Sequence, residues 1–433
     1  MLECINERFF GVATPIALIV AGVYFGCRLK WFHILAPIRT ARVALKGGGR
    51  SAFSALCLAL AGTLGVGKIV GVAAAISLGG YGAVFWMCLS AFFAMILKYS
   101  EIVVAVGHRR HGEGSAMYYI EDRFSARGGI IGRFLAVIFA SALAVNALTM
   151  GSMIQSGAAA EAFERIFYIP RPIVSVGLSA VALCVFGFGK AGVMRVTERI
   201  VPFMTVIFSV MSLIAIVMRC EKLPEAFRLI FRDAFSPHAA AGGIFGFVGS
   251  TGIRYGVMRG LISNEAGCGT SPMAHSESES KDPAISGVWG IFEVFIDTVV
   301  LCTMTALVII LSEVPLNGNG FMFITASAYS AILGEWAGMF MAVAALFFAF
   351  ATVICWWSYG RAGVIYIFRK RRAALLFSVL YVVAIALGGV ISSDLAWQAA
   401  DTSIGVMTII NVAALVLMRR EILERSSFLM RRY

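Results

Sequence analysis

The stretch GTLGVGKIVGVA, residues 62–73, decides how this chain is interpreted. It lies in an apolar segment, 53–78, that is long enough to cross a bilayer. Yet the stretch contains four glycines and one lysine. Glycine weakens a helix, and an ammonium group is costly in hydrocarbon. An ordinary membrane-spanning helix explains neither feature.

The composition of the whole chain is typical of a polytopic membrane protein. Of 433 residues, 60% are hydrophobic and 14% are charged, and the mean hydropathy is +0.87. A soluble protein of this length needs a more polar surface. Apolar runs therefore predict an all-α protein with about eleven transmembrane helices. They are expected near 11–28, 53–78, 82–106, 131–160, 172–188, 200–218, 242–262, 284–312, 336–368, 374–392 and 402–418.

The net charge of +12 is distributed unevenly along the chain. Basic clusters at 369–372 and in the tail after 418 fall on the same side of the predicted membrane. This positive-inside pattern predicts a multi-pass protein of the cell membrane, with the N-terminus outside and the C-terminus in the cytoplasm. We therefore assign the basic charge to topology in the lipid bilayer and expect no nucleic-acid partner. Nothing in the sequence specifies an oligomeric state.

Catalytic and metal-binding signatures are missing from the sequence. The nine cysteines and five histidines are dispersed without ligand spacing, so we expect no metal site. Neither HExxH nor GxSxG occurs, and we expect no catalytic residues. A membrane enzyme is accordingly a weak alternative.

A second glycine-interrupted segment, GGIFGFVGSTGIRYG at 242–256, lies far from the first. Each segment opens a block of five predicted spans, so the blocks enter the membrane from opposite sides. This arithmetic predicts a five-plus-five inverted repeat with a broken helix in each half. The alternative is that the glycines only let helices pack closely. We divide the chain into an extra N-terminal helix and basic loop (1–50), two repeats (51–220 and 221–420) and a basic tail (421–433).

A broken helix exposes N–H groups on one half and C=O groups on the other. Each group costs several kcal/mol if it is left unpaired in hydrocarbon (about 2–7 kcal/mol). A carboxylate binds well to the N–H groups at a half-helix N-terminus, and a cation binds to the carbonyls. Such a site suits a small zwitterion that travels with a cation.

Three stretches together resemble the alanine or glycine:cation symporter family. They are 62–87, 253–276 followed by FIDTVVLCTMTALVII from Phe295, and ALFFAFATVICWWSYG at 345–360. The resemblance implies a secondary transporter of small neutral amino acids with the leucine-transporter fold, usually coupled to sodium. It involves no cofactor beyond a coupling ion, Na⁺ or H⁺.

Two positions depart from the family pattern. Lys68 stands where the family has asparagine, and Ala351 precedes Thr352 where the family has serine-threonine. The resemblance implies sodium ligands at these places, but a lysine has three donors and no acceptor. Lys68 also lies too deep for its side chain to reach the interface. We interpret it as a substitute for the cation; the alternative is drift in a protein that has lost its coupling.

The candidate site residues follow from the breaks and the resemblance. For substrate binding we expect Gly62, Thr63, Gly65, Gly67, Lys68, Phe247, Gly249, Ser250 and Thr251. Around the cation site or its substitute we expect Leu64, Lys68, Ala351 and Thr352. In SNEAGCGTSP, 263–272, Glu265 is expected to pair with Arg259 in an inner gate beside Asn264; the alternative is a capped helix–loop corner.

Two further carboxylates, Glu293 and Asp297, lie four residues apart on one helix face, where they line a proton path or are simply buried and hydrogen-bonded. The function we predict is secondary transport of alanine or glycine, sodium-independent or proton-linked. A non-transporting membrane receptor that senses the same substrate is the other class left open.

Overall fold

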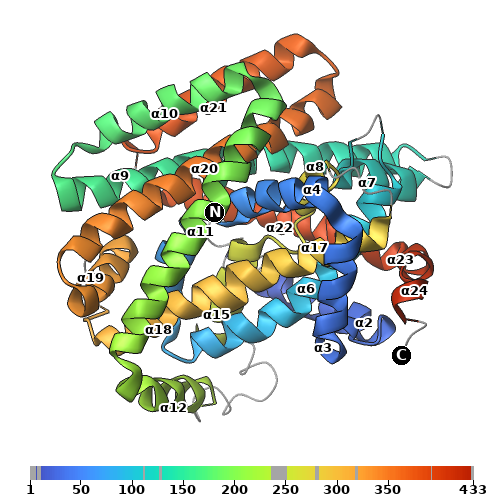
Figure 1. Ribbon diagram of the computed structural model, residues 1–433. Helices are drawn as coiled ribbons and strands as arrows, with labels where there is room; N and C mark the ends of the chain where they lie inside the picture. The colour runs from blue at the N-terminus through green and yellow to red at the C-terminus, as the bar shows by residue number, and fades with distance from the viewer. Residues whose placement is uncertain are drawn as a thin grey trace.

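The computed structural model describes residues 6, 11–110, 113–125, 129–235, 251–277, 282–316, 320–391 and 393–430. Within these ranges the chain is helical, and the only β pairing is an isolated bridge between Arg110 and Glu113. Figure 1 shows long helices crossing one another in a single bundle. The expected all-α class is therefore confirmed.

The helices follow one another along the chain with short connections. The first half comprises α2 (Gly11–Arg28), α3 (Phe32–Leu35), α4 (Pro37–Thr63), η2 (Gly67–Gly71), α5 (Val72–Gly79), α6 (Ala83–Gly107), α7 (Ala116–Ser125), α8 (Ile131–Leu148), η3 (Thr149–Met153), α9 (Ile154–Phe167), α10 (Arg171–Gly187), α11 (Gly189–Met218), η4 (Cys220–Lys222) and α12 (Leu223–Ala234). The second comprises α15 (Thr251–Asn264), α16 (Ser271–His275), α17 (Pro283–Val294), η5 (Phe295–Cys302), α18 (Thr303–Ser312), α19 (Phe321–Leu333), α20 (Trp336–Phe368), α21 (Arg371–Leu387), α22 (Ser393–Leu417), α23 (Arg419–Arg425) and α24 (Ser427–Met430).

Six of the described helical runs are long and apolar enough to cross a membrane, and the bent pair Gly49–Thr63 plus Gly67–Gly79 makes a seventh. Shorter apolar helices lie at Ala13–Arg28, Arg171–Gly187 and Phe321–Leu333. The last of these, α19, is not among the expected spans. The expected span 242–262 lies partly outside the described residues.

The centre of the bundle is formed by α6, α17 and α20, whose side chains are largely buried. The pair α17 and α6 packs closely, as does α15 with α6, while α20 packs on α8 and α9. Outer helices α10, α11 and α21 instead expose large apolar side chains such as Ile173, Phe203 and Leu375. In Figure 1, α10 and α21 lie side by side at one edge of the bundle. Such an apolar outer face is suited to lipid tails.

Three wide helical turns interrupt the central helices, at η2, η3 and η5. Turns with i→i+5 hydrogen bonds are frequent at functional sites. Lys68 lies in the first, and Asp297 lies in the third. η2 packs against η5, and α20 packs against η3. The three irregular turns therefore converge on one region of the bundle.

Candidate functional site

The first break separates α4 from η2 and bends the span by 52°. α4 ends at Thr63, whose hydroxyl turns back to the carbonyls of Ala59 and Leu60 at 3.3 and 3.5 Å. Leu64, fully buried, leaves the helical conformation, and Gly67 starts the next helical piece. The predicted break in GTLGVGK is thus present at residues 64–66.

Gly65 fits at this break because it has no side chain. A Cβ atom at this position would lie 2.7 Å from Gln155 Oε1 and 3.0 Å from Thr352 Oγ1. Gln155 holds the break from α9: its Oε1 accepts from the Val66 amide at 3.0 Å, and its Nε2 donates to the Met150 carbonyl at 3.1 Å. No sequence pattern pointed to Gln155, because 89 residues separate it from Val66.

Three side chains of α20 donate to carbonyls near the end of α4. Thr352 Oγ1 lies 2.9 Å from the Ala61 oxygen, Cys355 Sγ 3.2 Å from the Leu58 oxygen, and Trp356 Nε1 3.3 Å from the Gly62 oxygen. We call Thr352, Cys355 and Trp356 the α20 clasp. It gives side-chain donors to the Ala61 and Gly62 carbonyls, which belong to the last turn of α4 and lack intrahelical donors, and a further donor to the Leu58 carbonyl one turn earlier. Ala351, beside Thr352, is fully buried and adds no oxygen.

Lys68 is fully buried two residues beyond the break. Its Nζ lies 3.9 Å from the centroid of the Phe348 ring, a cation–π contact. Among the described residues, Nζ has no hydrogen-bond partner. Asp297 is the carboxylate whose charge acts on it, from beyond ion-pair distance. A charged group of this kind is stable in hydrocarbon only with a further partner.

Asp297 faces Lys68 from η5. Its Oδ2 accepts from Ser263 at 2.8 Å and from Thr298 at 3.0 Å. Its Oδ1 has no partner within the described part of the chain. An ammonium group and a carboxylate oxygen, both buried and unpaired, therefore lie near each other beside the first break. This arrangement can hold a ligand that accepts a hydrogen bond from the Lys68 ammonium group and donates one to the Asp297 carboxylate.

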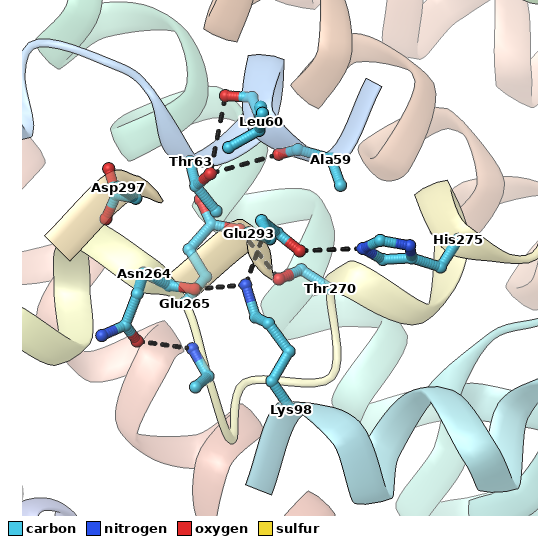
Figure 2. A network of polar contacts seen from close by, with 12 residues as sticks. Ala59, Leu60, Thr63, Lys98, Asn264, Glu265, Thr270, His275, Glu293 and Asp297 are labelled. Carbon is cyan, nitrogen blue, oxygen red and sulfur yellow. Dashed lines mark hydrogen bonds and ion pairs between the residues drawn. The ribbon is translucent and has the colours of Figure 1, made fainter. Parts of the chain in front are cut away.

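A second break lies between α15 and α16, at residues 265–270. Glu265, Gly267 and Gly269 adopt positive φ angles of 53°, 84° and 76°. Glu265 is held in this left-handed conformation by hydrogen bonds from Thr270 at 2.8 Å and from Trp356 at 3.2 Å. Because Trp356 also donates to Gly62, it joins the two breaks. Figure 2 shows Glu265 and Thr270 in this segment, with Thr63 of the first break close by.

The break at 265–270 is additional to the one expected in 242–256, which the described residues test only from Thr251 on. The described part of that segment, from Thr251 on, is the helical start of α15 and is not unwound. Phe247, Gly249 and Ser250 lie outside the described residues, as does the side chain of Thr251. The break at 265–270 falls in the stretch assigned to a gate.

The gate residues have other partners than expected. The Arg259 guanidinium lies 5.0 Å from the Trp397 ring centroid and near Asp401, whereas Glu265 contacts Thr270 and Trp356. Asn264 Oδ1 accepts from the Ala266 amide at 3.0 Å and so caps the turn that follows α15. The gating role of these residues remains a prediction, but its ion pair is not the one expected.

A cavity of about 830 Å³ leads to the first break. Val66 of the break and Val70 of η2 line it, together with the polar residues Glu161, Arg259 and Asp401. A path of this size admits a small polar solute to the break.

Broken helices around a buried polar site, enclosed by a bundle with an apolar outer face, define a helical membrane transporter. The profile of the sodium:alanine symporter family matches residues 1–430, and the chain belongs to that family. It is 32% identical to the sodium/alanine symporter AgcS of Methanococcus maripaludis over 434 residues, 96% of this chain and 94% of the relative. It is 34% identical to an uncharacterized transporter of Haemophilus influenzae over 440 residues, 98% and 95% of the two chains.

Solved structures agree on the fold. The chain resembles MhsT in complex with L-phenylalanine with a TM-score of 0.64, 14% identity, and coverage of 88% of this chain and 92% of that one. A Na⁺-coupled sialic acid symporter gives a TM-score of 0.58 at 13% identity, with 99% and 98% covered. The predicted family and the general class, a secondary amino-acid transporter rather than an enzyme, are thereby confirmed.

Proposed function

We propose that this protein transports small neutral amino acids, alanine or glycine, and that the ammonium group of Lys68 takes the place of a sodium ion at the substrate carboxylate. The observation that carries the proposal is the fully buried Lys68 Nζ, which has no hydrogen-bond partner among the described residues. A substrate carboxylate is the partner that this group lacks.

The backbone of the first break supports the same ligand. The run from Gly67 to Gly79 presents its N-terminus at the break, where N–H groups and the helix dipole favour an anion. Lys68 belongs to that first turn. A carboxylate placed there gains the helix N-terminus and the ammonium group together, while the substrate's own ammonium group is left to the carbonyl and carboxylate oxygens of the second break.

The altered cation ligands support coupling without sodium. Lys68 offers no acceptor, Ala351 offers no oxygen, and the Thr352 hydroxyl already donates to the Ala61 carbonyl. The same carbonyl region is occupied by the rest of the α20 clasp. The relative AgcS is named a sodium/alanine symporter, so this chain is proposed as a variant in which Lys68 replaces the ion.

The architecture we propose is that of eleven spans in a five-plus-five inverted repeat after one extra helix. The break after α4 supports it, because it falls in the first span of the first proposed repeat, 51–220; the break after α15 directly follows the first span of the second, 221–420. The basic loop within 1–50 and the tail 421–433 would lie in the cytoplasm, with the N-terminus outside.

The test is uptake and binding of radiolabelled alanine with purified protein in proteoliposomes, in sodium and with sodium replaced by choline. We expect binding and uptake in choline to equal those in sodium within about twofold. Excess unlabelled alanine or glycine should compete, and leucine should not. Steep dependence on sodium would overturn the proposal; binding without uptake would indicate a substrate-sensing receptor instead.

A further inference from the structure

A second cavity, with a volume of about 600 Å³, lies between α4 and α11, apart from the proposed substrate site. Three arginines line it: Arg50 of α4, and Arg195 and Arg199 of α11. The other lining residues are Phe53, Ala191, Met194 and Glu198. Its volume is within the range of about 300–1,000 Å³ that is usual for small-molecule sites.

The charges of this cavity favour an anion. Arg50, Arg195 and Arg199 are exposed, and none of them forms an ion pair within the described part of the chain. Glu198 is the one acidic side chain among the described lining residues, and it accepts a hydrogen bond from the buried Ser54 hydroxyl. Three positive charges therefore face one negative charge, and guanidinium groups pair well with a phosphate.

The sequence of α11 places these arginines at one edge of the hydrocarbon layer. Beyond Arg199, every exposed side chain of the helix is apolar: Phe203, Val206, Val210, Leu213, Ile214, Val217 and Met218. The run from Arg199 to Met218 rises by about 28 Å in an α-helix. This rise is close to the roughly 30 Å thickness of the hydrocarbon core of a bilayer. Arg195 and Arg199 therefore lie at the level of the lipid headgroups.

The proposed topology puts this edge on the cytoplasmic side. Arg50 closes the basic loop within 1–50, and Arg195 and Arg199 belong to the basic start of α11. Under the positive-inside rule both segments face the cytoplasm. The cytoplasmic leaflet carries anionic lipids, and basic pockets between membrane helices on this side bind their headgroups.

Apolar side chains next to the arginines fit the acyl chains of a lipid. Phe53 of α4 is 45% exposed and lines the cavity together with Met194 of α11. After Phe53 the side chains of α4 are buried from Ser54 to Ala61, so α4 no longer presents a surface to the membrane there. The apolar face of α11 continues from the cavity into the hydrocarbon layer. A free phosphate ion would make no use of Phe53 or of this face.

We propose that the cavity between α4 and α11 binds an anionic glycerophospholipid of the cytoplasmic leaflet. The lipid phosphate lies on Arg195 and Arg199, Arg50 adds a third positive charge from α4, and the acyl chains follow the apolar face of α11. α4 packs on α11 and ends at the first break, so the bound lipid stabilises the packing of the helix that carries the break. The site is separate from the substrate site and does not depend on which amino acid is transported.

The experiment is native mass spectrometry of the purified, delipidated full chain, titrated with phosphatidylglycerol or with phosphatidylcholine of the same acyl chains. The parent should bind phosphatidylglycerol about tenfold more tightly. Each arginine contributes about fivefold to affinity for an anionic lipid, so Arg195→Gln combined with Arg199→Gln should weaken binding roughly 25-fold. Arg371→Gln combined with Arg372→Gln is the matched control. It removes two exposed arginines from the same proposed side of the membrane but outside the cavity, and its affinity should stay within about twofold of the parent.

Glu198→Gln provides a variant with the opposite expected effect. It keeps an acceptor for Ser54 and removes the negative charge, so the affinity for phosphatidylglycerol should rise about fivefold. Thermal unfolding without lipid should be the same in all variants and the parent, which excludes a loss of fold.

Three results would overturn the inference. Equal affinity of the parent for the two lipids would show that the headgroup charge is not recognised. Equal losses in the two double variants would assign the binding to diffuse surface charge. Displacement of phosphatidylglycerol by an equal concentration of inorganic phosphate would indicate a site for free phosphate. Sodium-free alanine binding tests the proposed function separately, so failure of either can be told from failure of the other.

Discussion

At the scale of single residues, the proposed function depends most on Lys68. Lys68→Ala removes the only cation proposed for the carboxylate, and a charged hydrogen bond contributes about 1.5–3 kcal/mol. We expect sodium-free alanine binding to weaken by roughly 10- to 100-fold in equilibrium binding measurements. Lys222→Ala, which removes a surface partner of Glu313, serves as the control and should bind normally. Unchanged affinity in Lys68→Ala would rule out the assigned role.

The reverse substitution asks whether the sodium sites can be rebuilt. Lys68→Asn combined with Ala351→Ser returns two oxygens to positions where the family pattern has them. We expect alanine binding by the double variant to rise with sodium concentration, since a cation is again needed beside Asp297 and the carboxylate. Titration of binding against sodium at constant ionic strength measures this, with either single substitution as the comparison. A double variant indifferent to sodium would show that other residues determine the coupling.

Glu265 is the residue at which our prediction and the structure differ in detail. Its carboxylate joins Thr270 to Trp356 across the second break and makes no ion pair with Arg259. Glu265→Gln preserves the shape and one acceptor, so we expect the fold to persist while the maximal uptake rate changes severalfold. Uptake kinetics against thermal unfolding of the same sample separate the two effects. Uptake kinetics equal to those of the parent would show that Glu265 only stabilises the helix–loop corner and has no role in gating.

At the scale of elements, the break at 64–66 was predictable from sequence, and the break at 265–270 was not. The glycines and Lys68 of 62–71 mark the first break directly. The break expected in 242–256 stays a prediction up to Ser250, because only the part from Thr251 on is described, whereas a break that was not expected follows Asn264, where two glycines and Glu265 take positive φ. The number of glycines shows only where the backbone can leave the helical conformation. The position of a break is fixed by the side chains that hold it, here Thr270 and Trp356.

The contacts that hold both breaks could not be predicted from sequence, because they join residues that are far apart along the chain. Trp356 and Gly62 are 294 residues apart, and Lys98 and Glu293 are 195 apart. Apolar periodicity predicts that such helices exist, but not which faces meet. Lys98 was visible as an isolated charge in an apolar run, without a sign of its partner. The wide turns at η3 and η5 also leave no mark in composition.

Substitution of glycines in the first break tests how tightly it is packed. Gly65→Ala would place a Cβ atom 2.7 Å from Gln155, and such overpacking typically costs about 1–3 kcal/mol. Gly71→Ala, one turn on, meets nothing within 4 Å and is the matched control. We expect thermal unfolding of Gly65→Ala at a lower temperature and with weaker alanine binding, and Gly71→Ala to be unchanged or slightly stabilised. Equal behaviour of the two variants would contradict the described geometry.

At the scale of the whole molecule, the C-terminal helix α23 is fastened across the ends of α6 and α7. His108, just beyond α6, lies 2.8 Å from Asp122 and 3.0 Å from Glu421. Tyr99 adds a bond to Ser426 at 2.7 Å. The hydrogen bond to Glu421 raises the pKa of His108 above its ordinary value of 6.5, burial opposes this, and Asp122 adds to it. When it is protonated, the imidazole links the end of α6 to α7 and to α23.

The sign of the pH effect follows from that raised pKa. A group that binds its proton more tightly in the folded state stabilises the fold fully below its unfolded pKa, near 6.5. This stabilisation is lost as the pH rises through the higher folded value. We expect the unfolding temperature of the parent in nanodiscs to fall across this window, and His108→Gln to lose that part of the fall. Were His108→Gln to follow the parent curve, the imidazole would be neutral in the fold.

The α20 clasp has a consequence for the handling of the purified protein. Where carbonyls at a helix break depend on an ion, the ion is part of the folded structure, and dilution into ion-free buffer weakens the protein by mass action. Here three side chains of one helix, Thr352, Cys355 and Trp356, donate hydrogen bonds to carbonyls of α4 within the folded protein itself. Under the proposed function these carbonyls need no ion, so we expect transfer of the resting protein into sodium-free buffer to leave its unfolding temperature unchanged.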